Sequence, residues 1–149
     1  MSGPAPRSLT ESELQLILEE GTFGTLASVR ATGHPHLATV LYRWSPDERT
    51  LRISTTEGRL KPGHFRADPH AALHVRRDDF AFAVAEGEAE VSAPSAEPGD
   101  AVGRELLAMA GEFVPEGGEE AFLAEMVDER RVVIRIKVAR LYGTALDVT

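Results

Sequence analysis

The sequence predicts a mainly β fold, a six-stranded antiparallel β-barrel that is closed or partly split and has flanking helices. Six segments show strand character, several with the two-residue period of strands, and most of the connections between them are short turns. Parallel neighbours need crossovers of roughly a dozen residues or more, so the short connections favour antiparallel pairing. A barrel hides strand edges from solvent, and it fits these segments better than an open sheet does.

The elements follow one another in an order that local signals define. Thr10 and Glu13 form a capping-box pattern ahead of apolar residues at helical spacing, which predicts a helix over residues 10–20. The predicted strands cover residues 22–30, 35–45, 51–55, 70–76, 80–91 and 131–144. Two further helices are expected at about Asp100–Ala110 and Glu119–Asp128, with a Gly- and Pro-containing loop between them that is a candidate lid or a plain connection.

A turn rich in hydroxyl groups and cations follows the strand at residues 51–55. Ser54, Thr55 and Thr56 come first, and Arg59 and Lys61 then stand at the start of a short predicted helix. This helix must end at Asp68-Pro69, because proline disfavours the helical conformation in the residue before it. Backbone N–H groups at a helix N-terminus lack intrahelical partners and carry partial positive charge, so the turn predicts a site for a small anion.

Composition limits the classes of function. The chain has 149 residues, which we expect to form a single domain over residues 1–149 with a loose leader at residues 1–8. A net charge of −8 disfavours nucleic-acid binding, and the absence of cysteine excludes thiolate chemistry. His34 and His36 share a strand face without a third ligand at matching spacing, so we expect no metal site. No apolar segment is long enough to span a membrane, and we expect a cytoplasmic protein.

Several segments together resemble a known family. They are Gly33–Tyr42, Ser54–Lys61, Arg66–Pro69, Ala83–Gly87 and Val138–Gly143, in that order along the chain. The sequence resembles the pyridoxamine-phosphate-oxidase-like split-barrel proteins that bind FMN or F420, and within them the actinobacterial branch that uses the deazaflavin coenzyme F420.

The resemblance implies a homodimer with a flavin-like cofactor at the subunit interface. It implies that Arg59 and Lys61 bind the cofactor phosphate, and that Thr39 faces the ring. The remaining cofactor-binding residues that it implies are Ser54, Thr55, Thr56, Phe80 and Ala81, the last two reaching across the interface. Pro62 and His64 depart from the family pattern at the start of the helix, which removes one backbone donor there.

The function implied is that of an F420-dependent oxidoreductase, which passes a hydride from reduced deazaflavin to an unidentified conjugated small molecule. The cofactor carries the hydride chemistry in such enzymes, so the lack of a catalytic triad in the sequence is unsurprising. Two alternatives stay open. One is an FMN-binding oxidase or reductase on the same fold, and the other is a carrier that binds the cofactor without catalysis. For His36, the sequence leaves open a proton donor or an ordinary packed histidine.

Overall fold

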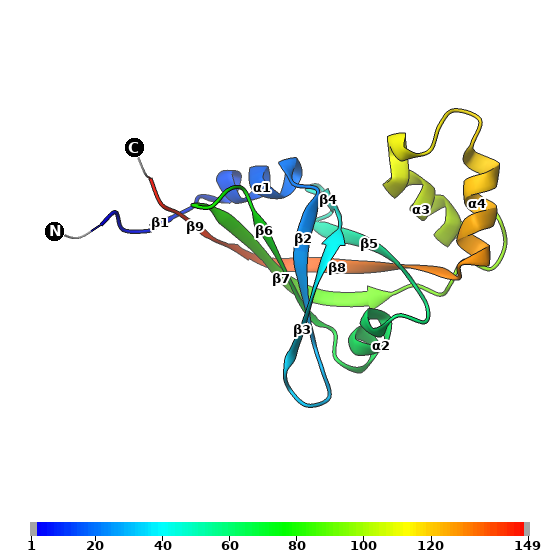
Figure 1. Cartoon of the computed structure of the whole chain (residues 1–149), viewed down its shortest axis with the longest axis horizontal. Helices are drawn as coiled ribbons and strands as arrows, with labels where there is room; N and C mark the ends of the chain where they lie inside the picture. Colours follow the sequence, from blue (N-terminus) through cyan, green and yellow to red (C-terminus); the bar gives the residue numbers. More distant parts are fainter. Residues whose placement is uncertain (1–2, 148–149) are drawn as a thin grey trace.

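A computed structural model describes residues 3–147 and contains a curled antiparallel sheet with flanking helices (Figure 1). The strands are β1 (Arg7–Ser8), β2 (Phe23–Val29), β3 (Pro35–Leu41), β4 (Arg43–Ser45), β5 (Thr50–Thr56), β6 (His70–Arg76), β7 (Phe82–Val91), β8 (Arg131–Tyr142) and β9 (Thr144–Ala145). The helices are α1 (Glu11–Glu20), α2 (Leu60–Ala67), α3 (Ala101–Ala110), the 3₁₀ helix η1 (Gly111–Phe113) and α4 (Glu119–Asp128). The predicted mainly β fold is confirmed.

The main sheet has seven strands in the order β3-β2-β6-β7-β8-β5-β4, one more than predicted. The difference arises at Tyr42, where the single strand expected over residues 35–45 bends into β3 and β4. The N–H group of Tyr42 donates to the carbonyl of Thr22 at 3.1 Å, in register with the pairing of β2 and β3, and from Arg43 on the chain pairs with β5 instead. Since β3 pairs with β2 while β4 pairs with β5, this bend carries the chain from one edge of the sheet to the other, and the curled sheet forms a partly open barrel.

The Tyr42 side chain also supports the C-terminal end of α1. It is buried, and its hydroxyl donates to the carbonyl of Leu18 at 2.6 Å. Burial raises the pKa of Tyr42 to about 12. The last carbonyls of a helix have no partner inside the helix, so the hydroxyl satisfies a group that would otherwise be buried without one.

We expect Tyr42→Phe to lower the free energy of unfolding by about 1–2 kcal/mol, because the Leu18 carbonyl loses its donor in a buried position. Chemical denaturation measures the change. Tyr142→Phe is the matched control, since the Tyr142 ring is 38% exposed and its effect should stay within about 0.5 kcal/mol. Equal stabilities for the two variants would contradict this role of Tyr42.

Turn geometry corrects the start of the long strand predicted at residues 80–91. Asp78 accepts a hydrogen bond from the N–H of Phe80 at 2.8 Å, which keeps Phe80 in the turn. Ala81 makes only an isolated bridge to Ala145, and regular pairing begins at Phe82. An aspartate that binds the backbone two residues on favours a turn over a strand.

The ends of the chain differ from the prediction in a similar way. The last strand, predicted to reach Thr144, ends at Tyr142, and β9 then pairs with β1. The expected leader at residues 1–8 therefore ends in a short strand, while Met1 and Ser2 lie outside the described residues. No helix in residues 3–147 is long and apolar enough to cross a membrane.

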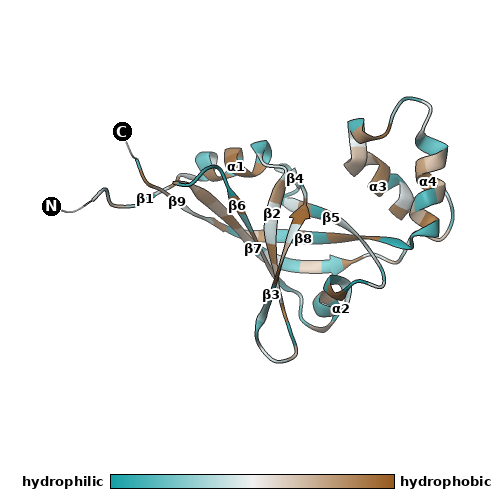
Figure 2. Cartoon of the chain, in the orientation of Figure 1, coloured by the Kyte–Doolittle hydropathy of each residue, from teal (hydrophilic) through white to brown (hydrophobic). Residues whose placement is uncertain are grey.

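The helices take different places around the sheet. α1 begins with the predicted capping box of Thr10 and Glu13, and it packs its apolar face on the core inside the barrel. α2 turns Pro62 and Phe65 into the interior. α3 and α4 lie side by side at the end of the molecule opposite the chain termini, and Figure 2 shows apolar residues on both.

Candidate functional site

The turn after β5 leads into α2 as the sequence predicted. The N–H of Arg59 donates to the carbonyl of Thr56 at 3.1 Å, and helix α2 begins at the next residue. No side chain caps this helix, although Arg59 has the extended backbone of a cap residue. The N–H groups of its first turn are therefore free of side-chain partners and can bind an anion.

The two cations of this turn have no ion-pair partner among the residues that the structure describes. By contrast, Arg66 on the same helix makes two hydrogen bonds to Glu57, at 2.6 and 2.9 Å. Partial burial, together with the neighbouring Arg59 guanidinium, lowers the pKa of Lys61. A bound anion would relieve this repulsion, so the pair favours a negatively charged ligand.

Two histidines lie between this turn and the hairpin of β2 and β3. The buried Ser28 hydroxyl lies 2.9 Å from Nδ1 of His64, and the ring centroids of His64 and His36 lie 5.1 Å apart. The Nδ1 atom of His36 is buried and has no hydrogen-bond partner. Burial lowers the pKa of His36, and so do the charges of Arg30, His64 and Lys61.

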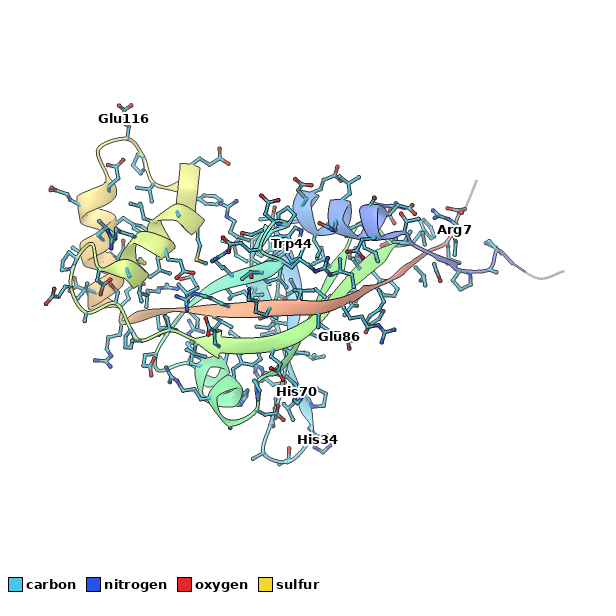
Figure 3. The ribbon with its side chains drawn as sticks, turned by 180° about the vertical axis from the view of Figure 1, so that it is seen from behind. Arg7, His34, Trp44, His70, Glu86 and Glu116 are labelled. Atoms are coloured by element: carbon cyan, nitrogen blue, oxygen red, sulfur yellow. The ribbon has the colours of Figure 1, made fainter. Side chains whose placement is uncertain are left out.

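The basic cluster consists of five residues, Arg30, His36, Arg59, Lys61 and His64. They come from the β2–β3 hairpin, α2 and the turn before it, and Figure 3 shows the hairpin, marked by His34, on the same side of the molecule as α2. The sequence singled out Arg59 and Lys61, and it offered His36 only as an alternative. Nothing local in the sequence indicates that Arg30 or His64 belongs to this cluster, because they are brought together only when α2 lies against the hairpin.

The three hydroxyl residues of β5 do not share a face. Ser54 is exposed and Thr56 is half-buried on the outer surface of the barrel. Thr55 is buried, with its side chain turned toward the barrel interior, because successive residues of a strand point to opposite faces. Only Ser54 and Thr56 therefore present side chains to a ligand outside the barrel.

Thr39 is also on the outer face, but on β3, where it borders a shallow hollow with Phe23, Thr25, His74 and Arg76. This hollow lies over strands β3, β2 and β6, and Thr39 is on the face of β3 opposite to the face of His36.

Phe80 and Ala81 lie at the far end of β6 from α2. The seven residues of β6 run from His70, next to α2, to Arg76 at the β6–β7 turn, a span of roughly 20 Å. Phe80 is 48% exposed, whereas Ala81 is buried. Within one chain these two residues do not join the basic cluster.

No three His, Cys, Asp or Glu side chains within residues 3–147 gather in a way that could hold a metal ion.

The family model of pyridoxamine 5'-phosphate oxidase matches residues 10–145, which is nearly the whole chain.

Solved structures of similar fold span nearly the whole chain. A conserved hypothetical protein from Mycobacterium tuberculosis has a TM-score of 0.74 at 20% identity, with 97% of this chain and 90% of that chain covered. An FAD-binding protein from Mesorhizobium loti has a TM-score of 0.68 at 20% identity, covering 98% and 100%. An F420 reductase has a TM-score of 0.62 at 20% identity, covering 89% and 98%. At this identity the likeness shows a shared fold.

Proposed function

Because the chain belongs to the pyridoxamine 5'-phosphate oxidase family, we propose that it is an F420-dependent oxidoreductase. Family membership indicates a flavin-type cofactor and oxidoreductase-like chemistry. The observation that carries the finer proposal is the basic cluster, where Arg59 and Lys61 have no carboxylate partner among residues 3–147 of a chain with net charge −8.

The residues present fit a phosphorylated cofactor. The first turn of α2 offers backbone donors, and Arg59 and Lys61 offer charge. Arg59 and Lys61 bind the phosphate, while Ser54 and Thr56 line the adjoining polar chain from the outer face of β5. When bound, the deazaflavin supplies the hydride. These side chains would hold it in place for hydride transfer to a conjugated acceptor.

A second copy of the chain completes the proposed site. Phe23, Leu37 and Leu41 are 60%, 61% and 43% exposed on the outer faces of the paired strands β2 and β3. Apolar residues grouped in this way on a sheet surface favour burial in an interface. In the proposed homodimer this face is covered, Thr39 faces the ring, and Phe80 and Ala81 of the partner subunit reach the cofactor that they cannot reach within one chain.

Equilibrium titration of the apoprotein with F420 and with FMN tests this proposal. We expect saturable binding of F420. Light scattering should show a dimer, and absorbance should show two bound cofactors per dimer. Tight FMN binding without affinity for F420 would replace the proposal with an FMN-dependent function. Firm F420 binding without reduction of any member of a quinone, enone and tetrapyrrole panel would instead favour a carrier.

A further inference from the structure

A second cavity lies on the outside of the barrel, under the helical pair. Its volume is about 380 Å³, which is within the range of small-molecule sites. The floor comes from the outward side chains of β3, β4 and β5, including Leu41 and Ser54, and the roof comes from α3, η1 and α4. This is the end of the molecule that Figure 1 shows opposite the chain termini, and Figure 3 marks the α3–α4 loop there with Glu116.

The helical pair is fixed on the sheet, so the cavity is part of the fold. Glu105 of α3 accepts hydrogen bonds from Arg52 of β5 and Arg135 of β8, both from Nε at 2.8 Å. The hydrogen bonds from Arg135 lower the pKa of Glu105, and Arg52 acts in the same direction. Beside this ion pair, Leu106 and Met126 pack on Val133 in a small buried apolar cluster.

The lining combines apolar walls with positive charge. The apolar walls combine flat aromatic rings with flexible side chains, and they come from Leu106, Met109, Phe113, Phe122 and Met126. Arg43, Arg52 and Arg131 line the same cavity, and no carboxylate among the described residues does so. Glu48 and Glu105 pair with Arg52, and Glu129 pairs with Arg131 at 2.6 Å, so among the described residues the unpaired positive charge of the lining is that of Arg43.

Arg43 is the arginine of this lining that makes no ion pair among residues 3–147. Arg52 donates hydrogen bonds to Ser45, Glu48 and Glu105 at 3.0, 2.6 and 2.8 Å, so two carboxylates already pair with its charge. Arg43 donates only its Nε, to the carbonyl of Met109 at 2.7 Å, and its guanidinium lies 5.6 Å from the centre of the Phe113 ring. Within residues 3–147, its two terminal nitrogens have no hydrogen-bond partner.

We propose that this cavity binds an apolar, ring-containing small molecule with one anionic group, a carboxylate or sulfonate, which pairs with Arg43. Resting on the proposed function, this ligand is the acceptor, because Ser54 lines the cavity and shares a face of β5 with Thr56, after which the chain turns toward Arg59 and Lys61. The apolar walls bind the rings, and the arginine selects for the anion.

Two fluorescent dyes that differ by one anionic group test the assignment with the full chain. They are 8-anilinonaphthalene-1-sulfonate and its neutral counterpart N-phenyl-1-naphthylamine. We expect the sulfonate to bind about tenfold tighter or more, as one charged hydrogen bond predicts. Arg43→Gln should remove most of this difference and leave binding of the neutral dye unchanged. Arg104→Gln, an exposed arginine of α3 outside the cavity, is the matched control and should change neither dye.

Equal affinities for the two dyes, or an Arg43→Gln chain that keeps the full preference for the sulfonate, would overturn the proposal. Lys61→Ala separates this result from the cofactor site. If Lys61→Ala weakens sulfonate binding as strongly as Arg43→Gln does, the dye occupies the basic cluster, and the acceptor cavity is rejected while the proposed function stands. If F420 fails to bind but the Arg43-dependent preference persists, the cavity stands and the proposed function fails.

Discussion

Lys61→Ala should weaken F420 binding by about tenfold or more, and Arg59→Ala/Lys61→Ala together by about a hundredfold or more. Neither cation has an ion-pair partner among residues 3–147, so each is available to the phosphate. Partial burial strengthens the contact, because a charge pair shielded from water is screened less. Isothermal calorimetry or absorbance titration gives the dissociation constants.

The chain provides its own control for this experiment. Lys137 is the only other lysine in the sequence, and it is exposed on β8. Lys137→Ala changes the net charge by the same amount as Lys61→Ala and should leave the dissociation constant unchanged. If both variants bind F420 as the wild type does, the basic cluster is not the phosphate site.

Gly87→Ala should lower the free energy of unfolding by about 3 kcal/mol or more, because the backbone of β8 occupies the space that a side chain would need. A Cβ atom at this position would lie 1.8 Å from the carbonyl oxygen of Lys137. The register between β7 and β8 shifts between Glu86 and Gly87, so two paired strands approach closely at a bulge. Denaturant titration followed by circular dichroism measures the loss.

Gly63→Ala is the contrasting variant. Gly63 is inside α2, and a Cβ atom there would meet nothing within 4 Å. Alanine in a helix is more favourable than glycine by about 0.5–1 kcal/mol, so this variant should be slightly more stable than the wild type. Similar stability changes for Gly63→Ala and Gly87→Ala would contradict the close approach of β8 at Gly87.

Local signals predicted the elements around the candidate site well. The capping box of Thr10 and Glu13 is present, and Asp68-Pro69 ends α2, because both signals act through neighbouring residues. The bend at Tyr42 was missed. The alternation of inward and outward residues continues through it, and only the change of pairing partner, from β2 to β5, reveals the break.

The site itself could be predicted only in part. The cationic turn is a local feature and was identified, and cofactor binding by its residues stays a prediction. Thr55 was grouped with Ser54 and Thr56 by proximity in sequence, although strand geometry turns it inward. Arg30 and His64 join the basic cluster through tertiary contacts, and the cavity at Arg43 depends on α3 being held by Glu105. Neither arrangement leaves a pattern along the chain.

The crystal structure of the chain with F420 bound tests the central claim most directly. We expect the phosphate at the start of α2, within hydrogen-bonding distance of Lys61 Nζ and the Arg59 guanidinium, and a second protomer closing over the ring. A deazaflavin seated elsewhere, with Arg59 and Lys61 extending into solvent, would contradict the account.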